Sequence, residues 1–232
     1  MSVTCACWIE PGTLADWLVA IGTIALAAIA IAQDTIRRLI YHPRFKVSCK
    51  TEPPDCVAVP MARPDGTFLA DSIYLRIFIQ NEGNATAQDV EVYAMQLRRQ
   101  RADQSWETVD SFPPMNLIWS NFGGAMYARI VPGMGKHCDV GHIVDPARRQ
   151  VVAEDSPRLG LASSQTSLAF DLVARPNNRT HIVGPGNYEL DIQIAAENVP
   201  PAKRTLTLSV VGPWYADEMR MLREGVGISV TR

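Results

Sequence analysis

One uninterrupted apolar stretch near the amino terminus constrains this chain more than any other feature of its sequence. Residues 14–32 contain a single charged side chain, Asp16, and residues 17–33 contain none. Nineteen residues in an α-helix span about 28 Å, close to the ~30 Å hydrocarbon thickness of a bilayer. A buried core helix of this length would show a polar face, and a signal peptide would have a basic region before it. Residues 1–16 contain no Lys or Arg, so the segment predicts a single transmembrane helix.

The flanks of this stretch predict where the helix meets the membrane surfaces and which side the rest of the chain occupies. Amphipathic rings favour the headgroup region, so Trp17 and Tyr41 are expected at the two interfaces. The residue before a proline avoids helical angles, which predicts a helix end just before Pro43. Basic residues stay on the cytoplasmic side. Within residues 1–50 they all follow the apolar stretch, at Arg37, Arg38, Arg44, Lys46 and Lys50.

These observations predict three parts with one topology in the bacterial inner membrane. Residues 1–13 are expected to form a short tail outside the cytoplasm, and residues 14–42 a transmembrane helix with a cytoplasmic extension. Residues 43–232 are expected to form the cytoplasmic domain. The residues expected at the membrane interface are Trp17, Arg37, Arg38 and Tyr41.

Small residues in the helix raise the question of whether it also associates with other helices. Ala25, Ala28 and Ala32 share one face, and small faces let helices approach closely in lipid. This face is therefore a candidate surface for homo-oligomerisation. The other interpretation is that alanine is merely tolerated in a simple anchor, and the sequence leaves both open.

Composition and charge indicate what kind of protein the chain is. The protein has 232 residues, of which 47% are hydrophobic and 20% charged, with a net charge of −2. These values are typical of a globular domain and give no global basic field to attract nucleic acid. The five cysteines are an odd number and do not suggest a secreted disulfide framework. Cys49 and Cys56 would be candidates for pairing only if the domain faced an oxidising space.

Alternation of apolar and polar residues predicts that residues 43–232 are mainly β. In the segment NYELDIQIA, Tyr188, Leu190, Ile192 and Ile194 alternate with polar residues, as in a strand with one buried face. The same pattern occurs at residues 72–80, 89–95, 167–174 and 205–211, and more weakly at 44–49, 115–120, 126–131 and 137–144. Many short strands separated by turn residues favour an antiparallel β-sandwich.

Two segments carry a resemblance to a known fold family. LRIFIQNEGNATAQDVEVYAMQL, residues 75–97, resembles the strand–turn–strand core of bacterial adhesion-type and other immunoglobulin-like sandwiches. VGPGNYELDIQIAAENVPPAKRTLTLSVV, residues 183–211, resembles their final hairpin. The resemblance implies an elaborated immunoglobulin-like antiparallel β-sandwich, with insertions expected at residues 98–116 and 145–166. The turn at residues 81–83 is expected to use the tolerance of Asn and Gly for positive φ.

The sequence contains no catalytic constellation, metal site or cofactor motif that we would defend. The segment HCDVGH includes His137, Cys138, Asp139 and His142, but on a regular strand His137 points away from both Cys138 and His142. Phosphate-binding glycine loops, serine elbows and zinc-protease helices are missing from the sequence. The basic cluster at Arg98, Arg99 and Arg101 is either a lipid-facing patch or, as we prefer, a solvated hairpin tip.

Two functions fit these features. The first is a single-pass, membrane-anchored binding or scaffold module that presents a cytoplasmic β-sandwich to a protein partner, without enzymatic activity. The alternative is a membrane sensor or effector of a bacterial stress or anti-phage system that oligomerises through its helix. Only the small-residue face favours the alternative.

Overall fold

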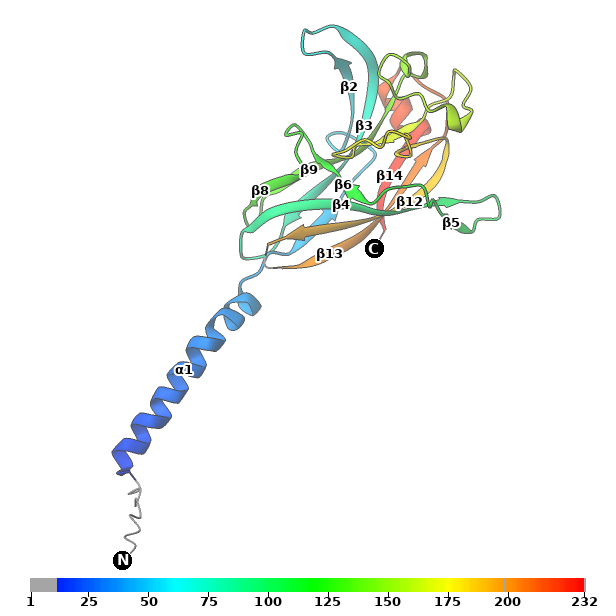
Figure 1. Cartoon of the computed structure of the whole chain (residues 1–232). Helices are drawn as coiled ribbons and strands as arrows, with labels where there is room; N and C mark the ends of the chain where they lie inside the picture. Colours follow the sequence, from blue (N-terminus) through cyan, green and yellow to red (C-terminus); the bar gives the residue numbers. More distant parts are fainter. Residues whose placement is uncertain (1–11, 198, 232) are drawn as a thin grey trace, which may run out of the picture. The chain divides into compact units, whose positions relative to one another are not determined.

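The computed structural model describes residues 12–197 and 199–231, apart from the side chains of residues 34–39. The chain divides into two compact units, residues 1–41 and residues 42–232, which we describe separately. Figure 1 shows the first as one helix and the second as a β-rich domain.

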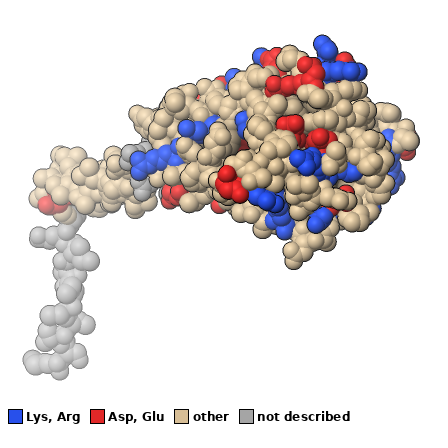
Figure 2. Space-filling model, turned by 90° about the horizontal axis from the view of Figure 1, so that it is seen from above, with Lys and Arg blue, Asp and Glu red and all other residues tan. Residues whose placement is uncertain are grey.

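Helix α1, Leu14–Ile40, is the first unit's regular element. Its amino-terminal turn is closed by Thr13, whose backbone N–H and hydroxyl both donate hydrogen bonds to Asp16. Residues Leu14–Gln33 have a mean hydropathy of 2.2, and none of this window is buried in the protein. By length and composition this helix can cross a membrane, a test that a signal sequence also passes. Figure 2 shows its surface as mostly uncharged, whereas acidic and basic residues are interspersed on the visible face of the domain.

The domain contains two antiparallel sheets, so the predicted mainly-β class is confirmed. Within the described residues, the first, sheet A, has strands in the order β1-β3-β9-β10-β11, with β2 also paired to β3 and β7 to β9. Its strands are β1 (Phe45–Ser48), β2 (Cys56–Ala62), β3 (Phe68–Asn81), β7 (Ile118–Trp119), β9 (Gly135–Val144), β10 (Leu168–Phe170) and β11 (Ile182–Val183).

The second sheet, sheet B, has the order β14-β13-β12-β4-β5 within the same described residues, and β6 and β8 also pair with β4. Its strands are β4 (Ala87–Gln100), β5 (Trp106–Thr108), β6 (Met115–Asn116), β8 (Met126–Ile130), β12 (Gly186–Ala196), β13 (Val199–Val210) and β14 (Val226–Thr231). The short helical turns are η1 (Pro146–Arg148), η2 (Pro157–Leu159), α2 (Glu218–Arg220) and the π-helical η3 (Met221–Gly225).

The hydrophobic core is formed by the inner faces of both sheets. The apolar positions predicted to face inward on residues 72–80 and 187–195 are at most 2% exposed, and they share one buried cluster. Trp119 of sheet A reaches across this core, and its indole N–H donates a hydrogen bond to the carbonyl of Val90 in sheet B at 3.1 Å. The burial of alternate residues thus fixes which face of each strand remains available for a site.

Two of the register shifts between paired strands change which side chains reach the outer faces of the sheets. In β9 the register with β3 shifts between the pairs Leu75–Gly141 and Arg76–Asp139, leaving Val140 as the extra residue. In β4 the register with β12 shifts so that Met95 is the extra residue. A bulge re-aims the neighbouring side chains and is frequent beside functional sites.

The turn that follows β3 corrects one sequence prediction. Neither Asn81 nor Gly83 has a positive φ. Glycine is instead required at position 83 because an added Cβ would lie 2.3 Å from the carbonyl oxygen of His42. The constraint comes from the backbone that enters the domain, a contact that the local sequence does not reveal.

Candidate functional site

The outer face of sheet A carries a polar cluster that the sequence did not predict. Because of the bulge at Val140, His137 lies opposite Phe78 and His142 opposite Tyr74. Residues 74 and 78 of β3 project to the same face, so the two histidines also share that face. The prediction that His137 and His142 point to opposite faces was therefore wrong, since it assumed a regular strand.

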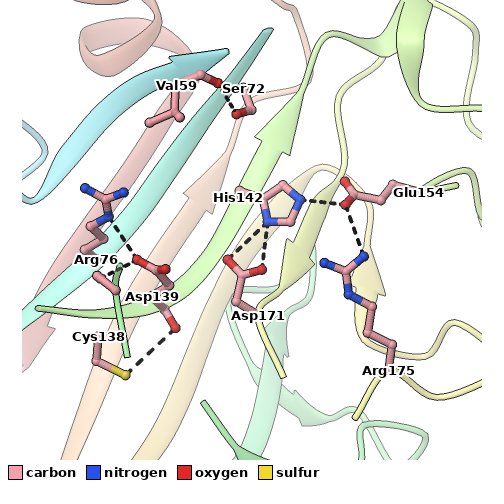
Figure 3. Close-up of polar contacts among 10 residues, drawn as sticks. Val59, Ser72, Arg76, Cys138, Asp139, His142, Glu154, Asp171 and Arg175 are labelled. Atoms are coloured by element: carbon pink, nitrogen blue, oxygen red, sulfur yellow. Dashed lines mark hydrogen bonds and ion pairs between the residues drawn. The ribbon is translucent and has the colours of Figure 1, made fainter. Parts of the chain in front are cut away.

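His142 forms the centre of a buried ion cluster, drawn in Figure 3. Its Nδ1 lies 2.9 Å from a carboxylate oxygen of Asp171, and its Nε2 lies 2.6 Å from Glu154. The Arg175 guanidinium is 3.8 Å from the same Glu154 oxygen. The ring of Tyr74 stacks on the imidazole with centroids 5.0 Å apart. Glu154 comes from the segment between β9 and β10, whereas Asp171 directly follows β10, a strand of the same sheet, so the cluster fastens residues 145–167 to sheet A.

The two carboxylates beside His142 keep its imidazole protonated. Burial by itself lowers the pKa of His142, but Asp171 and then Glu154 outweigh burial and raise the pKa to about 10. The imidazolium therefore donates from both ring nitrogens, and neither is free to accept a proton from a substrate. The nearby His181 is buried with an unpartnered Nδ1, and burial followed by the Arg175 charge lowers its pKa. These contacts therefore stabilise the packing of the segment between β9 and β10 on sheet A.

Further polar contacts extend along the same face. Arg76 donates a hydrogen bond to Asp139 at 2.9 Å, and the Ser120 hydroxyl donates to the same carboxylate oxygen. His137 lies 2.9 Å from Asp55. Within residues 12–197 and 199–231, no group of three or more His, Cys, Asp or Glu side chains is arranged to hold a metal ion.

The described cysteines lie in or beside the core. Cys56 and Cys138 are buried and Cys49 is half-buried, all three as free thiols. Burial, reinforced by neighbouring charges, raises the pKa of Cys49 and that of Cys56 to about 12. These thiols are thus protonated and unreactive at neutral pH.

The outer face of sheet B, by contrast, is open and contains a groove of about 1070 Å³. One wall is the loop after β5, and the floor crosses strands β4, β12, β13 and β14. The floor includes Met95, which the β4 bulge turns outward so that 39% of the residue is exposed. The lining residues are Met95, Gln96, Leu97, Thr108, Val109, Asp110, Phe112, Pro114, Asp191, Ile192, Gln193, Lys203, Arg204, Thr205 and Thr231.

Asp191, which lines the groove floor, is held by an ion pair with Arg98. Arg98 donates to Asp191 at 2.6 Å and to Glu189 at 3.0 Å, and the Thr205 hydroxyl donates to Asp191 at 2.6 Å. Burial raises the pKa of Asp191, but the hydrogen bonds from Arg98 and Thr205 outweigh it and lower the pKa below its ordinary value. The groove therefore presents a fixed carboxylate beside amide and hydroxyl groups, with Met95 and Val109 as apolar contacts.

The arginine cluster of the sequence is used within the domain. Arg98 belongs to the ion pair above, and Arg99 donates a hydrogen bond to the carbonyl of Pro185. Arg101 pairs with Glu107 across the β4–β5 hairpin. This set fits a hairpin with its own acidic partners better than a lipid-facing patch.

The membrane-related residues predicted from the sequence all lie on or next to helix α1. Trp17 and Tyr41 are 59% and 57% exposed. Ala25 and Ala28 are exposed and Ala32 is half-buried. Arg37 and Arg38 lie in the stretch whose side chains are outside the described part. The structure contains no bilayer and no second copy, so their roles stay predictions.

Comparison with known proteins identifies no family. No protein-family model matches the chain, and no curated protein matches its sequence. A solved structure described as a β-glucosidase involved in saponin metabolism from intestinal bacteria is similar to 72% of this chain, with 16% identity and a TM-score of 0.27. This chain spans only 16% of that protein's length. A likeness at this level carries no conclusion about activity.

Proposed function

We propose that the protein is a single-pass membrane protein whose cytoplasmic β-sandwich, of elaborated immunoglobulin-like type, binds a protein partner through the groove of sheet B. The observation that most supports binding through sheet B is the contrast between the outer faces of the two sheets. The outer face of sheet A holds a buried ion cluster around His142, whereas sheet B leaves a groove of about 1070 Å³ open to solvent.

Helix α1 supports the anchoring part of the proposal. Its apolar window, in which Asp16 is the single charged residue, is 20 residues long, which corresponds to about 30 Å of helix. The basic residues that follow it favour a cytoplasmic domain by the charge rule for membrane proteins. Free thiols with protonated sulfur at Cys49, Cys56 and Cys138 are compatible with a reducing compartment.

The groove supports the binding part. Its volume lies at the upper end of the ~300–1,000 Å³ of small-molecule sites, and it is an open surface that crosses several strands. An extended segment of a partner protein would find hydrogen-bonding groups at Gln96, Gln193 and Thr231, and an apolar contact at Met95. A bulge that turns a methionine into such a surface is typical of a site for an adaptable contact.

Fusion proteins test the topology. A fluorescent protein fused after Arg232 is expected to fluoresce, and alkaline phosphatase at the same position to be inactive, with the chain resisting alkaline carbonate extraction. Full phosphatase activity would place the domain on the other side of the membrane. Extraction of the chain by carbonate would contradict the proposal that α1 spans the membrane.

A matched pair of substitutions tests the groove. Met95→Arg fills the groove floor with a charged chain, whereas Met219→Arg makes the same change at a residue that is 62% exposed and does not line the groove. Quantitative mass spectrometry of the affinity-purified full chain should show a partner that is lost only with Met95→Arg. Equal partner recovery with both variants would contradict binding through the groove.

A second candidate function, the oligomerising membrane sensor, rests on the small-residue face of α1. Ala25 and Ala28 are exposed, and none of the apolar window of α1 is buried. Ala28→Leu should weaken cross-linking between copies in membranes, while Ile29→Leu, about 100° around the helix, should not. Identical cross-linking with both variants would leave the helix as an anchor only.

A further inference from the structure

The β8–β9 turn forms an exposed apolar tip at one end of the sandwich. Its sequence is Val-Pro-Gly-Met, residues 131–134, with Val131 45% and Met134 56% exposed. Gly133 adopts a positive φ of 77°, and the Met134 N–H donates a hydrogen bond to the Val131 carbonyl, so the turn has a defined shape. Exposed apolar side chains on a shaped turn are candidates for a contact with another surface.

The same turn is tied to the place where the chain enters the domain from α1. Asn81, fully buried at the end of β3, accepts a hydrogen bond from the Arg44 N–H on its side-chain oxygen at 3.1 Å. Its own backbone N–H donates to the Met134 carbonyl at 2.9 Å, and its backbone carbonyl accepts from Gly133 at 2.8 Å. Its side-chain amide also donates to the carbonyl of Ile130 at 2.9 Å. One buried asparagine therefore holds the apolar turn beside the first residues of the domain.

This link limits how far the turn lies from a membrane that contains α1. After the apolar window ends at Gln33, the helix continues to Ile40, which adds seven residues or about 10 Å, and residues 41–44 add at most about 14 Å. The headgroup region itself extends about 5–8 Å from the hydrocarbon core on each side. The chain therefore limits the end of the domain that holds Arg44 and Asn81 to about 24 Å from the hydrocarbon core, and a tilt of the helix extension brings this end to the headgroups.

Basic residues surround the apolar turn. Arg129 is exposed on β8 and Lys136 on β9, where the Lys136 ammonium lies over the Tyr127 ring at 5.3 Å. Arg44 and Lys46 share the single carboxylate of Glu82, at 3.3 Å and 2.8 Å. Asp89 and Glu197 lie at the same end of sheet B, so these four basic residues face three carboxylates, and the basic residues closest in sequence to the turn are Arg129 and Lys136. Apolar residues flanked by basic ones suit the interface of an anionic bilayer.

We propose that residues 131–134, with Arg129 and Lys136, contact the anionic headgroup layer of the bilayer that anchors the chain, and so hold the domain against the membrane by this end. The proposal rests on the proposed membrane anchor. Such a contact would fix the orientation of the domain, and hence the direction in which the groove of sheet B faces a partner protein.

A fluorescence experiment with the full-length chain tests this contact. Cys5, Cys7 and Cys49 are replaced by Ser, Met134 by Cys, and the new thiol is labelled with bimane; the remaining described cysteines are 0% exposed. The chain is reconstituted in phosphatidylcholine vesicles with or without phosphatidylglycerol, containing a headgroup-nitroxide lipid as quencher. The control label is at Arg63→Cys, beyond the far end of β3, whose 14 residues span about 45 Å.

The expected result is several-fold stronger quenching at position 134 than at position 63 in phosphatidylglycerol vesicles. Arg129→Gln with Lys136→Gln should reduce this quenching to the level seen in neutral vesicles. Weak quenching at position 134 in carbonate-resistant vesicles would overturn the contact while leaving the anchor intact, and cross-linking between two labelled turns would assign the surface to a second copy. Extraction of the chain by carbonate would overturn both the anchor and the contact.

Discussion

The two outer faces of the sandwich show how one β-domain treats polar surface in opposite ways. On sheet A, the carboxylates of Glu154, from the segment between β9 and β10, and of Asp171, after β10, neutralise His142 in a site that is 1% exposed on the histidine side chain. On sheet B, the polar side chains remain in contact with solvent, and Asp191 is 31% exposed on its side chain. The polar residues around His142 on sheet A are therefore used inside the fold, whereas those of sheet B remain accessible to solvent, as the proposed binding face requires.

Removing the centre of the sealed cluster should have the largest effect. His142→Ala leaves Asp171 and Glu154 buried without their common cation, a change that usually costs about 3–5 kcal/mol. We expect this loss in the free energy of unfolding, measured by denaturant titration of the full chain. Gln193→Ala on the open face should change it by less than about 0.5 kcal/mol. Equal effects from the two variants would remove the distinction between the faces.

The pH dependence of stability should report the same cluster. The pKa of His142 in the folded protein is about 10, above the ~6.5 of an unfolded chain. Its stabilisation is therefore fully present below pH ~6.5 and is lost as the pH rises toward about 10. Over that range we expect the unfolding free energy to fall by a few kcal/mol, on the order of 1.4 kcal/mol per pH unit. His142→Gln should flatten this slope, and an unchanged slope would exclude His142 as its source.

The ion pair in the groove should contribute less. Asp191→Asn keeps the shape of the side chain but removes the charge that Arg98 and Thr205 contact. A hydrogen bond to a charged group is worth about 1.5–3 kcal/mol when buried, and partial exposure together with the remaining Glu189 contact should reduce the loss to about 1 kcal/mol. Thermal unfolding at neutral pH measures it, and a loss as large as that of His142→Ala would show that sheet B is also a structural face.

The groove methionine should matter for binding and hardly at all for stability. Met95 is 39% exposed on a bulge, and truncation of such a residue usually changes stability by less than about 0.5 kcal/mol. We expect Met95→Ala to leave the melting temperature unchanged and to reduce recovery of the bound partner. A lower melting temperature with undiminished recovery would assign Met95 to packing.

Much of the fold was predictable from the sequence because strand alternation is a local signal. The inward positions of residues 187–195 and the outward positions of Glu189, Asp191 and Gln193 followed from the pattern alone. The bulges at Met95 and Val140 were not predicted, since they are set by pairing with distant strands. Gly141 gave a usable signal: a glycine inside a strand often marks a bulge or close backbone approach, and here an added Cβ would lie 2.6 Å from the carbonyl of Ala169.

The candidate sites were harder to predict than the fold. His142 was visible in the sequence, but its partners Glu154 and Asp171 lie 12 and 29 residues away. Glu154 approaches through the course of the segment between β9 and β10, and Asp171 through the pairing of β10 with β9, and no local pattern encodes either. The alternation of β12 predicts the outward residues on the floor of the groove. The wall formed after β5 belongs to a predicted insertion, whose course no local pattern encodes.

Photo-cross-linking in living cells is the most direct test of whether a partner protein binds in the groove of sheet B. A photoreactive phenylalanine analogue replaces either Gln193 in the groove or Val151, which is 46% exposed in the segment between β9 and β10 that also holds Glu154. We predict a discrete adduct with one protein from position 193 and none from position 151, and loss of that adduct when Met95→Arg is added. The same adduct from both positions, or an adduct from position 151 alone, would contradict the assignment of sheet B as the binding face.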